Sequence, residues 1–112
     1  MKIAVPTAAG NLCPHFGHCE KFIIVDVDEK SKSIIDKEEA VPPPHEPGVL
    51  PKWLSEKGVS TIIAGGMGMR AQQLFSQYGI EVVTGAPVEH PQTVVLNYLK
   101  GTLVTGSNLC DH

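Results

Sequence analysis

Side chains that bind soft metals are concentrated at two places in this sequence. All three cysteines lie there, and each has a histidine within two positions. The candidate ligands are Cys13, His15, His18 and Cys19 in segment 13–19, and Cys110 and His112 at the end of the printed sequence. Thiolate and imidazole groups select zinc, copper(I) and iron–sulfur centres over magnesium or calcium. The residue types therefore predict a site for a soft or borderline metal.

The spacing within segment 13–19 permits convergence of the ligands but differs from a standard zinc motif. Each residue spans at most about 3.3–3.6 Å when extended, so a loop that turns at Pro14 and Gly17 can bring four ligands together. Five residues separate Cys13 from Cys19, whereas zinc ribbons and fingers usually place about two to four between paired cysteines. The alternative is structural, because cysteine is often a small buried hydrophobe and histidine often bonds to backbone.

A second candidate site is a glycine-rich turn between a predicted strand and a predicted helix. Segment 65–71 is Gly-Gly-Met-Gly-Met-Arg-Ala. Glycines let backbone N–H groups approach a ligand, and the N-terminus of a helix carries partial positive charge. We therefore expect cofactor-binding groups at Gly65, Gly66, Gly68 and Arg70, unless the glycines serve close packing alone. The turn also fits a dinucleotide fingerprint formally, but no acidic residue follows the next strand, which disfavours NAD.

The elements that must position these residues follow from hydrophobic patterning. Residues 2–7, 21–28 and 33–38 are predicted strands of an antiparallel meander, and residues 59–64 and 80–83 are further strands. Three amphipathic helices are predicted, each followed by a glycine, at Gly58, Gly79 and Gly101. Helices that alternate with strands imply parallel pairing with right-handed crossovers. We expect one α/β domain over residues 1–112, with a mixed sheet and a loop-like tail from residue 102.

Composition and charge narrow the function classes. The chain has 112 residues, of which 42% are hydrophobic, and a formal net charge of −3. This charge does not indicate a nucleic-acid partner, because nucleic acid usually binds a clustered basic face of a protein. No apolar run approaches the roughly 20 residues that span a bilayer, and no signal peptide is evident, so we expect no membrane partner and a cytoplasmic location. In a reducing cytosol, three cysteines indicate metal binding, redox work or burial rather than disulfides.

The order of these motifs resembles the dinitrogenase iron–molybdenum cofactor-binding family, which includes NifX-like proteins and the C-terminal domain of NifB-like proteins. The shared features are MKIAVPT, the loop CPHFGHC before EKFIIVDVD, the turn VSTIIAGGMGMRA and the segment YGIEVVTGA. The resemblance implies a ribonuclease-H-like α/β fold with a five-stranded mixed sheet and about three helices. Nuclease activity does not follow from that fold, because the expected carboxylates are missing. The resemblance implies instead a non-enzymatic protein that binds or carries a metal–sulfur cluster.

The resulting hypothesis is a site in three parts. Segment 13–19, the glycine turn and the terminal Cys110 and His112 would surround an iron–sulfur or iron–molybdenum–sulfur cluster, with cofactor-assembly proteins as partners. The chain has more ligands than nitrogenase-linked family members often have, so a role outside nitrogenase assembly stays open. Zinc or copper(I) is the alternative metal, and a thiol-based redox protein or sensor is the alternative function. Two questions stay open: the role of His45 in the proline-rich segment 42–47, and the oligomeric state.

Overall fold

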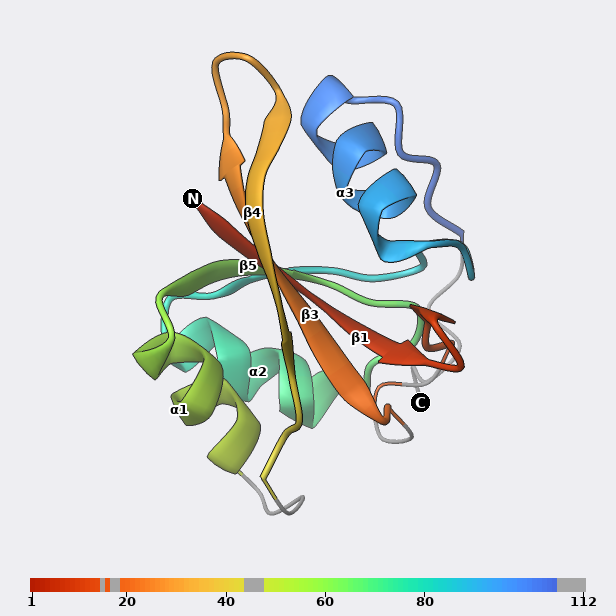
Figure 1. Ribbon diagram of the computed structural model, residues 1–112. Helices are drawn as coiled ribbons and strands as arrows, with labels where there is room; N and C mark the ends of the chain where they lie inside the picture. Colours follow the sequence, from red (N-terminus) through yellow and green to blue (C-terminus); the bar gives the residue numbers. More distant parts are fainter. Residues whose placement is uncertain (15, 17–18, 44–47, 107–112) are drawn as a thin grey trace.

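The computed structural model describes residues 1–14, 16, 19–43 and 48–106. The protein consists of a mixed sheet between two layers of helices (Figure 1). The strands are β1 (Lys2–Ala8), β2 (Asn11–Leu12), β3 (Lys21–Asp28), β4 (Ser33–Ala40), β5 (Val59–Ile63) and β6 (Glu81–Val83). The helices are α1 (Val49–Glu56), α2 (Met69–Gln77) and α3 (Pro91–Lys100). Helices α1 and α2 cover one face of the sheet, and α3 covers the other.

The sheet combines antiparallel and parallel pairing, as the sequence predicts. Its strand order is β4-β3-β1-β5-β6, with β2 paired to β1 outside this path. Strands β1, β3 and β4 form the antiparallel meander, whereas β1, β5 and β6 are parallel to one another. The short antiparallel pair of β1 with β2 was not predicted, because two residues carry no periodic signal.

Each face of the sheet has its own hydrophobic core because side chains alternate along the strands. On β3, Phe22 and Ile24 pack in the core under α1 and α2, whereas Val25 and Val27 pack in the core under α3. Strand β1 is buried from Ile3 through Thr7, as expected for a strand covered on both faces. Strand β4 lies at the edge and is mostly exposed.

The helix boundaries follow local sequence signals. His90 caps α3, where its Nδ1 accepts a hydrogen bond from the Gln92 N–H at 3.2 Å. Gly101 ends α3 in the left-handed conformation, with φ at 73°. The sequence pattern predicts Met69, Leu74, Phe75 and Tyr78 on the apolar side of α2, and this prediction is partly wrong. Phe75 is fully buried, but Met69 and Tyr78, at the two ends of the helix, are 55% and 42% exposed.

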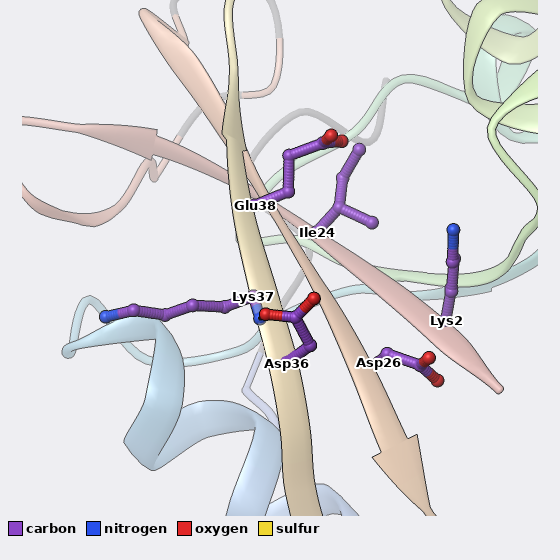
Figure 2. A pocket seen from close by; sticks show the side chains of 6 residues that line it. All are labelled: Lys2, Ile24, Asp26, Asp36, Lys37 and Glu38. Carbon is purple, nitrogen blue, oxygen red and sulfur yellow. The ribbon is translucent and has the colours of Figure 1, made fainter.

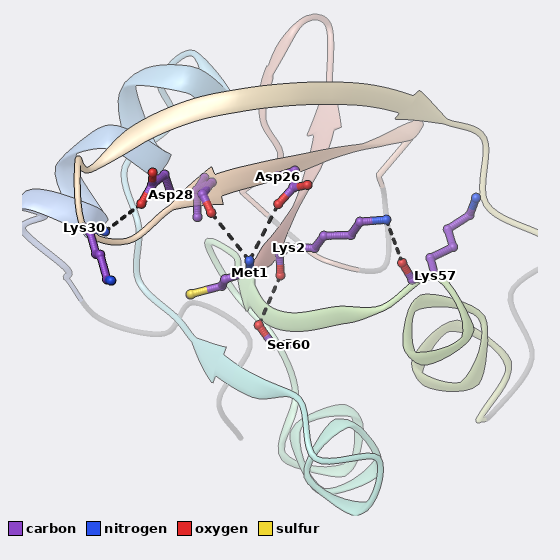
Figure 3. Close-up of polar contacts among 8 residues, drawn as sticks. Met1, Lys2, Asp26, Asp28, Lys30, Lys57 and Ser60 are labelled. Carbon is purple, nitrogen blue, oxygen red and sulfur yellow. Dashed lines mark hydrogen bonds and ion pairs between the residues drawn. The ribbon is translucent and has the colours of Figure 1, made fainter.

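Polar contacts fix the N-terminal end of β1 (Figure 3). The Met1 amino group lies 3.6 Å from the Asp26 carboxylate. Lys2 Nζ donates to the Lys57 carbonyl at 3.3 Å. Asp28 accepts hydrogen bonds from the backbone N–H groups after it, and these bonds lower the pKa of its carboxyl group. Asp26 and Asp28 therefore belong to the end of β3 and the turn that follows it.

Candidate metal-binding edge

The parallel strands β1, β5 and β6 place three connections at one edge of the sheet. The loop after Ala8, the glycine turn after Ile63 and the segment after Val83 all begin at the C-terminal ends of these strands. In α/β sheets, ligands bind in the crevice outside this edge. The fold therefore gathers the segments in which the sequence placed candidate ligands and glycines.

Backbone hydrogen bonds hold the loop after β1 at both of its ends. The Cys13 N–H donates to the Pro6 carbonyl at 2.9 Å, and the Glu20 N–H donates to the Thr7 carbonyl at 2.8 Å. The Leu12 N–H also donates to the carbonyl of Glu89, in the segment that precedes α3, at 2.9 Å. The two cysteine positions are thus fixed relative to the end of β1.

Phe16 anchors the middle of this loop in the hydrophobic core. Its ring lies edge-on to Phe75, with 5.6 Å between the ring centroids, and edge-on to Phe22, with 6.2 Å between the centroids. Edge-to-face pairs of this kind are favourable beyond the area that they bury. The sequence analysis gave Phe16 no role, although a single aromatic residue among ligands and turn formers was a signal for such an anchor.

The glycine turn lies directly against the loop. The Gly66 N–H donates to the Pro14 carbonyl at 2.7 Å, and the Gly66 carbonyl accepts from the Phe16 N–H at 2.9 Å. A Cβ on Gly65 would lie 2.9 Å from both Cα and the carbonyl oxygen of Pro14. Gly65 therefore serves close packing, and the Gly66 amide is engaged by the loop rather than directed at an anion as we expected.

The start of α2 provides positive charge beside the loop. Gly68 is its N-cap residue, in an extended conformation, and no acidic residue lies in the first turn. Arg70 is exposed, and within the described ranges it takes part in no ion pair. Met67 is fully buried in the core and therefore packs rather than serving as an accessible ligand, whereas Met69 is exposed.

Cys13 and Cys19 are the described sulfur donors of the loop. Both are thiols; Cys13 is buried, with 2% of its surface exposed, and Cys19 is partly buried. Burial, the largest cause, and the charge of Cys13 together raise the pKa of Cys19 from 9.0 to about 11, against a backbone hydrogen bond that lowers it. Cys19 is therefore protonated at neutral pH.

The remaining predicted ligands, His15, His18, Cys110 and His112, lie outside the described residues, as does His45. Among the residues that the structure describes, no three or more His, Cys, Asp or Glu side chains are grouped to hold a metal ion. The structure places the Cys13 backbone against Gly65 and Cys19 on the same loop, while the ligand set as a whole stays a prediction.

The described part of the C-terminal segment returns to the same edge. The Gly106 N–H donates to the Gly85 carbonyl at 2.7 Å, and the Gly85 N–H donates to the Gly65 carbonyl at 2.6 Å. Gly106 is the last described residue. The sequence analysis gave Gly85 no role; its position just after the third parallel strand was the available signal.

Two hollows lie away from these cysteines. One, of about 140 Å³, is lined by Lys2, Ile24, Asp26, Asp36, Lys37 and Glu38. Figure 2 shows that the Lys37 side chain points away from the three carboxylates of this hollow. The other, of about 280 Å³, lies between the β1–β2 hairpin and β4, where Lys21 Nζ and Glu39 pair at 2.7 Å. Neither contains Cys13 or Cys19. In the part of the chain that is described, no helix is long and apolar enough to cross a membrane.

Comparisons with known proteins agree with this architecture. The family model described as "Dinitrogenase iron-molybdenum cofactor" matches residues 1–101. An uncharacterised protein of Methanocaldococcus jannaschii is 36% identical over 107 residues, which cover 92% of this chain and 89% of that protein. The crystal structure of PH0822 has a TM-score of 0.86 and 28% identity, and the match covers 96% of each chain. The apo form of the orange protein from Desulfovibrio gigas, at a TM-score of 0.73 and 22% identity over 96% and 93% of the two chains, shares the fold.

Proposed function

This chain belongs to the dinitrogenase iron–molybdenum cofactor family, and from that membership we propose that it binds and carries a metal–sulfur cluster without catalysing a reaction itself. The cluster, of the iron–sulfur or iron–molybdenum–sulfur type, is cargo. The observation that carries the proposal is a contact at the C-terminal edge of the parallel strands. There the glycine turn meets the loop after β1 that carries Cys13 and Cys19, which we call the cysteine loop. This contact supports the proposal because it joins the loop that carries Cys13 and Cys19 to the turn that begins α2.

The donor set fits a cluster in its chemistry. Cysteine thiolates hold iron–sulfur clusters, and Cys13 and Cys19 are free thiols on one loop. His15, His18, Cys110 and His112 would complete the set. Cys110 is four residues beyond Gly106, and four extended residues reach at most roughly 14 Å. The chain length between Gly106 and Cys110 is therefore compatible with the proposed role of Cys110 at this edge.

The electrostatics of the edge also support an anionic cargo. A cluster held by thiolates carries negative charge, which the N-terminus of α2 and the Arg70 guanidinium would stabilise. No acidic residue of the first turn opposes them. The glycine turn thus contributes through the helix that it begins, rather than through the Gly66 amide.

A carrier must release its cargo, and the position of the loop suits release. The cysteine loop lies at an edge of the sheet, and Cys19 is only partly buried. Functional loops on rigid scaffolds combine access with a fixed geometry. We infer that cofactor-assembly proteins in the cytoplasm, where thiols stay reduced, deliver or receive the cluster.

The alternatives fit less well. A thiol-based redox sensor needs a thiol whose pKa is lowered, because the thiolate is the reactive form, whereas the pKa of Cys19 is raised. A mononuclear zinc or copper(I) site would use the same ligands, but the separation of Cys13 from Cys19 does not match the usual zinc spacing. The family is named after an iron–molybdenum cofactor, and this name favours a cluster over a single metal ion.

Anaerobic purification, followed by metal and acid-labile sulfide analysis and a visible spectrum, tests the proposal. Protein that emerges without metal is incubated with iron, sulfide and a thiol reductant, desalted and analysed again. We expect iron and sulfide together with broad charge-transfer absorption; molybdenum in the same fraction would identify the mixed cluster. One zinc per chain without sulfide, or no retained metal after incubation, would contradict the proposal.

A further inference from the structure

We propose that Gly85 is a positioning residue that fixes the C-terminal segment 102–106 beside the segment after β6, and that cluster retention through Cys110 and His112 depends on this contact. The consequence for the cluster rests on the proposed function, whereas the positioning itself does not. The sequence motifs singled out neither Gly85 nor its contact with Gly106.

Gly85 joins two segments through its backbone alone. Its N–H donates to the Gly65 carbonyl at 2.6 Å, and its carbonyl accepts from the Gly106 N–H at 2.7 Å. Gly66 then bonds in the same way to both Pro14 and Phe16. The C-terminal segment, the segment after β6, the glycine turn and the cysteine loop thus lie side by side, each hydrogen-bonded to the next.

Only glycine fits at position 85. Its φ is 78°, in the left-handed region that side chains disfavour. A Cβ at this position would overlap the Gly106 carbonyl oxygen, and would lie 2.9 Å from the Gly106 carbonyl carbon and 3.0 Å from its nitrogen. These atoms are all backbone, so a larger residue has to displace the segment that carries Gly106.

The segment has little else to hold it at this end. Thr102 and Leu103 both donate their N–H groups to the Asn97 carbonyl, at 2.9 and 3.2 Å, and Leu103 packs on the core under α3. Val104, by contrast, is 80% exposed. Among the described residues beyond Leu103, the backbone hydrogen bond that ties the segment to the fold is the one between Gly106 and Gly85.

Substitution of Gly85 by alanine tests the positioning, and the chain offers two matched controls. Gly79→Ala imposes the same left-handed strain, at a φ of 72°, but its Cβ meets nothing within 4 Å. Gly106→Ala adds a methyl group on the other partner, where the nearest atom is the Gly85 carbonyl oxygen at 3.9 Å. Amide hydrogen exchange, followed by NMR on the full chain, reports the Gly106 N–H directly.

We expect Gly85→Ala to speed exchange of the amide at position 106 by about tenfold or more, since a local contact opens while the core stays closed. Both controls should keep parental exchange there. The Ala64 amide, which donates to Val83 in the core of the sheet, serves as the check for folding and should stay protected in every variant. Equal exchange at position 106 in Gly85→Ala and Gly79→Ala would overturn the positioning role.

The consequence for the cluster is measured separately, on protein incubated with iron and sulfide. Combined substitution of Cys110 by serine and His112 by alanine should lower cluster retention in the Gly79→Ala background and have no further effect in the Gly85→Ala background. The same effect in both backgrounds, or none in either, would overturn this part. If the parent protein holds no cluster, the proposed function fails, while hydrogen exchange still decides the role of Gly85.

Discussion

The backbones of Gly65 and Pro14 are in direct contact, although 50 positions separate them in the chain. A methyl group on Gly65 would lie 2.9 Å from the Pro14 Cα and 3.1 Å from the Cys13 carbonyl oxygen. This contact joins the glycine turn after β5 to the cysteine loop after β1. The proposed cluster site depends on it, because it sets the distance between the thiols and the positive end of α2.

Gly65→Ala should therefore push the cysteine loop away from the turn. The neighbours are backbone atoms that cannot rotate aside, and overpacking of this kind typically costs about 1–3 kcal/mol of unfolding free energy. Urea denaturation measures the loss. Gly106→Ala is the control, since its added methyl group makes only an ordinary contact with the Gly85 carbonyl oxygen, at 3.9 Å, and should change stability by less than about 0.5 kcal/mol. Equal stability of the two variants would show that the Gly65 contact is unimportant.

Phe16→Ala should loosen the loop from the core without unfolding the domain. The substitution removes the edge-on contacts with Phe22 and Phe75. Because Phe16 is only partly buried, the loss of unfolding free energy should fall below the roughly 3–5 kcal/mol of a fully buried phenylalanine. Cluster retention should fall as well.

Two further variants separate the anchor from a general surface effect. Phe16→Leu keeps an apolar side chain and should restore most of the retention, whereas Tyr78→Ala truncates an exposed aromatic residue and should leave retention unchanged. Parental cluster retention in Phe16→Ala would mean that the ring does not position the loop.

Cys19 should react slowly with alkylating reagents near neutral pH. The thiolate is the reactive form, and the pKa of about 11 means that it forms two units above the ordinary value of 9.0. The iodoacetamide reaction rate at Cys19, followed by mass spectrometry, should keep rising with pH beyond 9 and level off only near 11. A cysteine in the urea-unfolded chain is the reference and should level off near 9. A plateau at or below pH 9 in the folded protein would contradict the assignment.

The raised pKa of Cys19 also makes the free energy of unfolding depend on pH. Since the pKa of Cys19 is higher in the folded state than in the unfolded state, folding favours the protonated thiol. Its contribution is fully present below pH 9 and is lost as pH rises from 9 to 11. Cys19→Ala should therefore flatten the decline in unfolding free energy over this interval. If the unfolding free energy of Cys19→Ala declined as steeply as that of the parent, other titrating groups would be its cause.

The sequence predicted most of the fold because local patterns and the final structure agree. Segment 21–28 is rich in β-branched residues, alternates with aspartate toward its end and forms β3, and His90 and Gly101 mark the two ends of α3. The site was less predictable, since its contacts join residues far apart in the chain. No local pattern reveals that the Gly66 amide bonds to Pro14, or that Gly85 meets Gly106. The sequence shows that positions 66 and 85 are glycines. Which residues they contact becomes known only when the parallel strands are aligned at one edge of the sheet.

Removal of the two loop thiols tests the central claim most directly. Cys13→Ala and Cys19→Ala are combined, because alanine keeps the buried position of Cys13 apolar where serine would bury a hydroxyl group. Parent and variant are incubated anaerobically with iron and sulfide, desalted, and analysed for both elements, with circular dichroism as the check that the variant is folded. We predict that the parent retains iron and sulfide and that the folded variant loses most of both. Parental amounts in the folded variant would show that this loop does not hold the cluster.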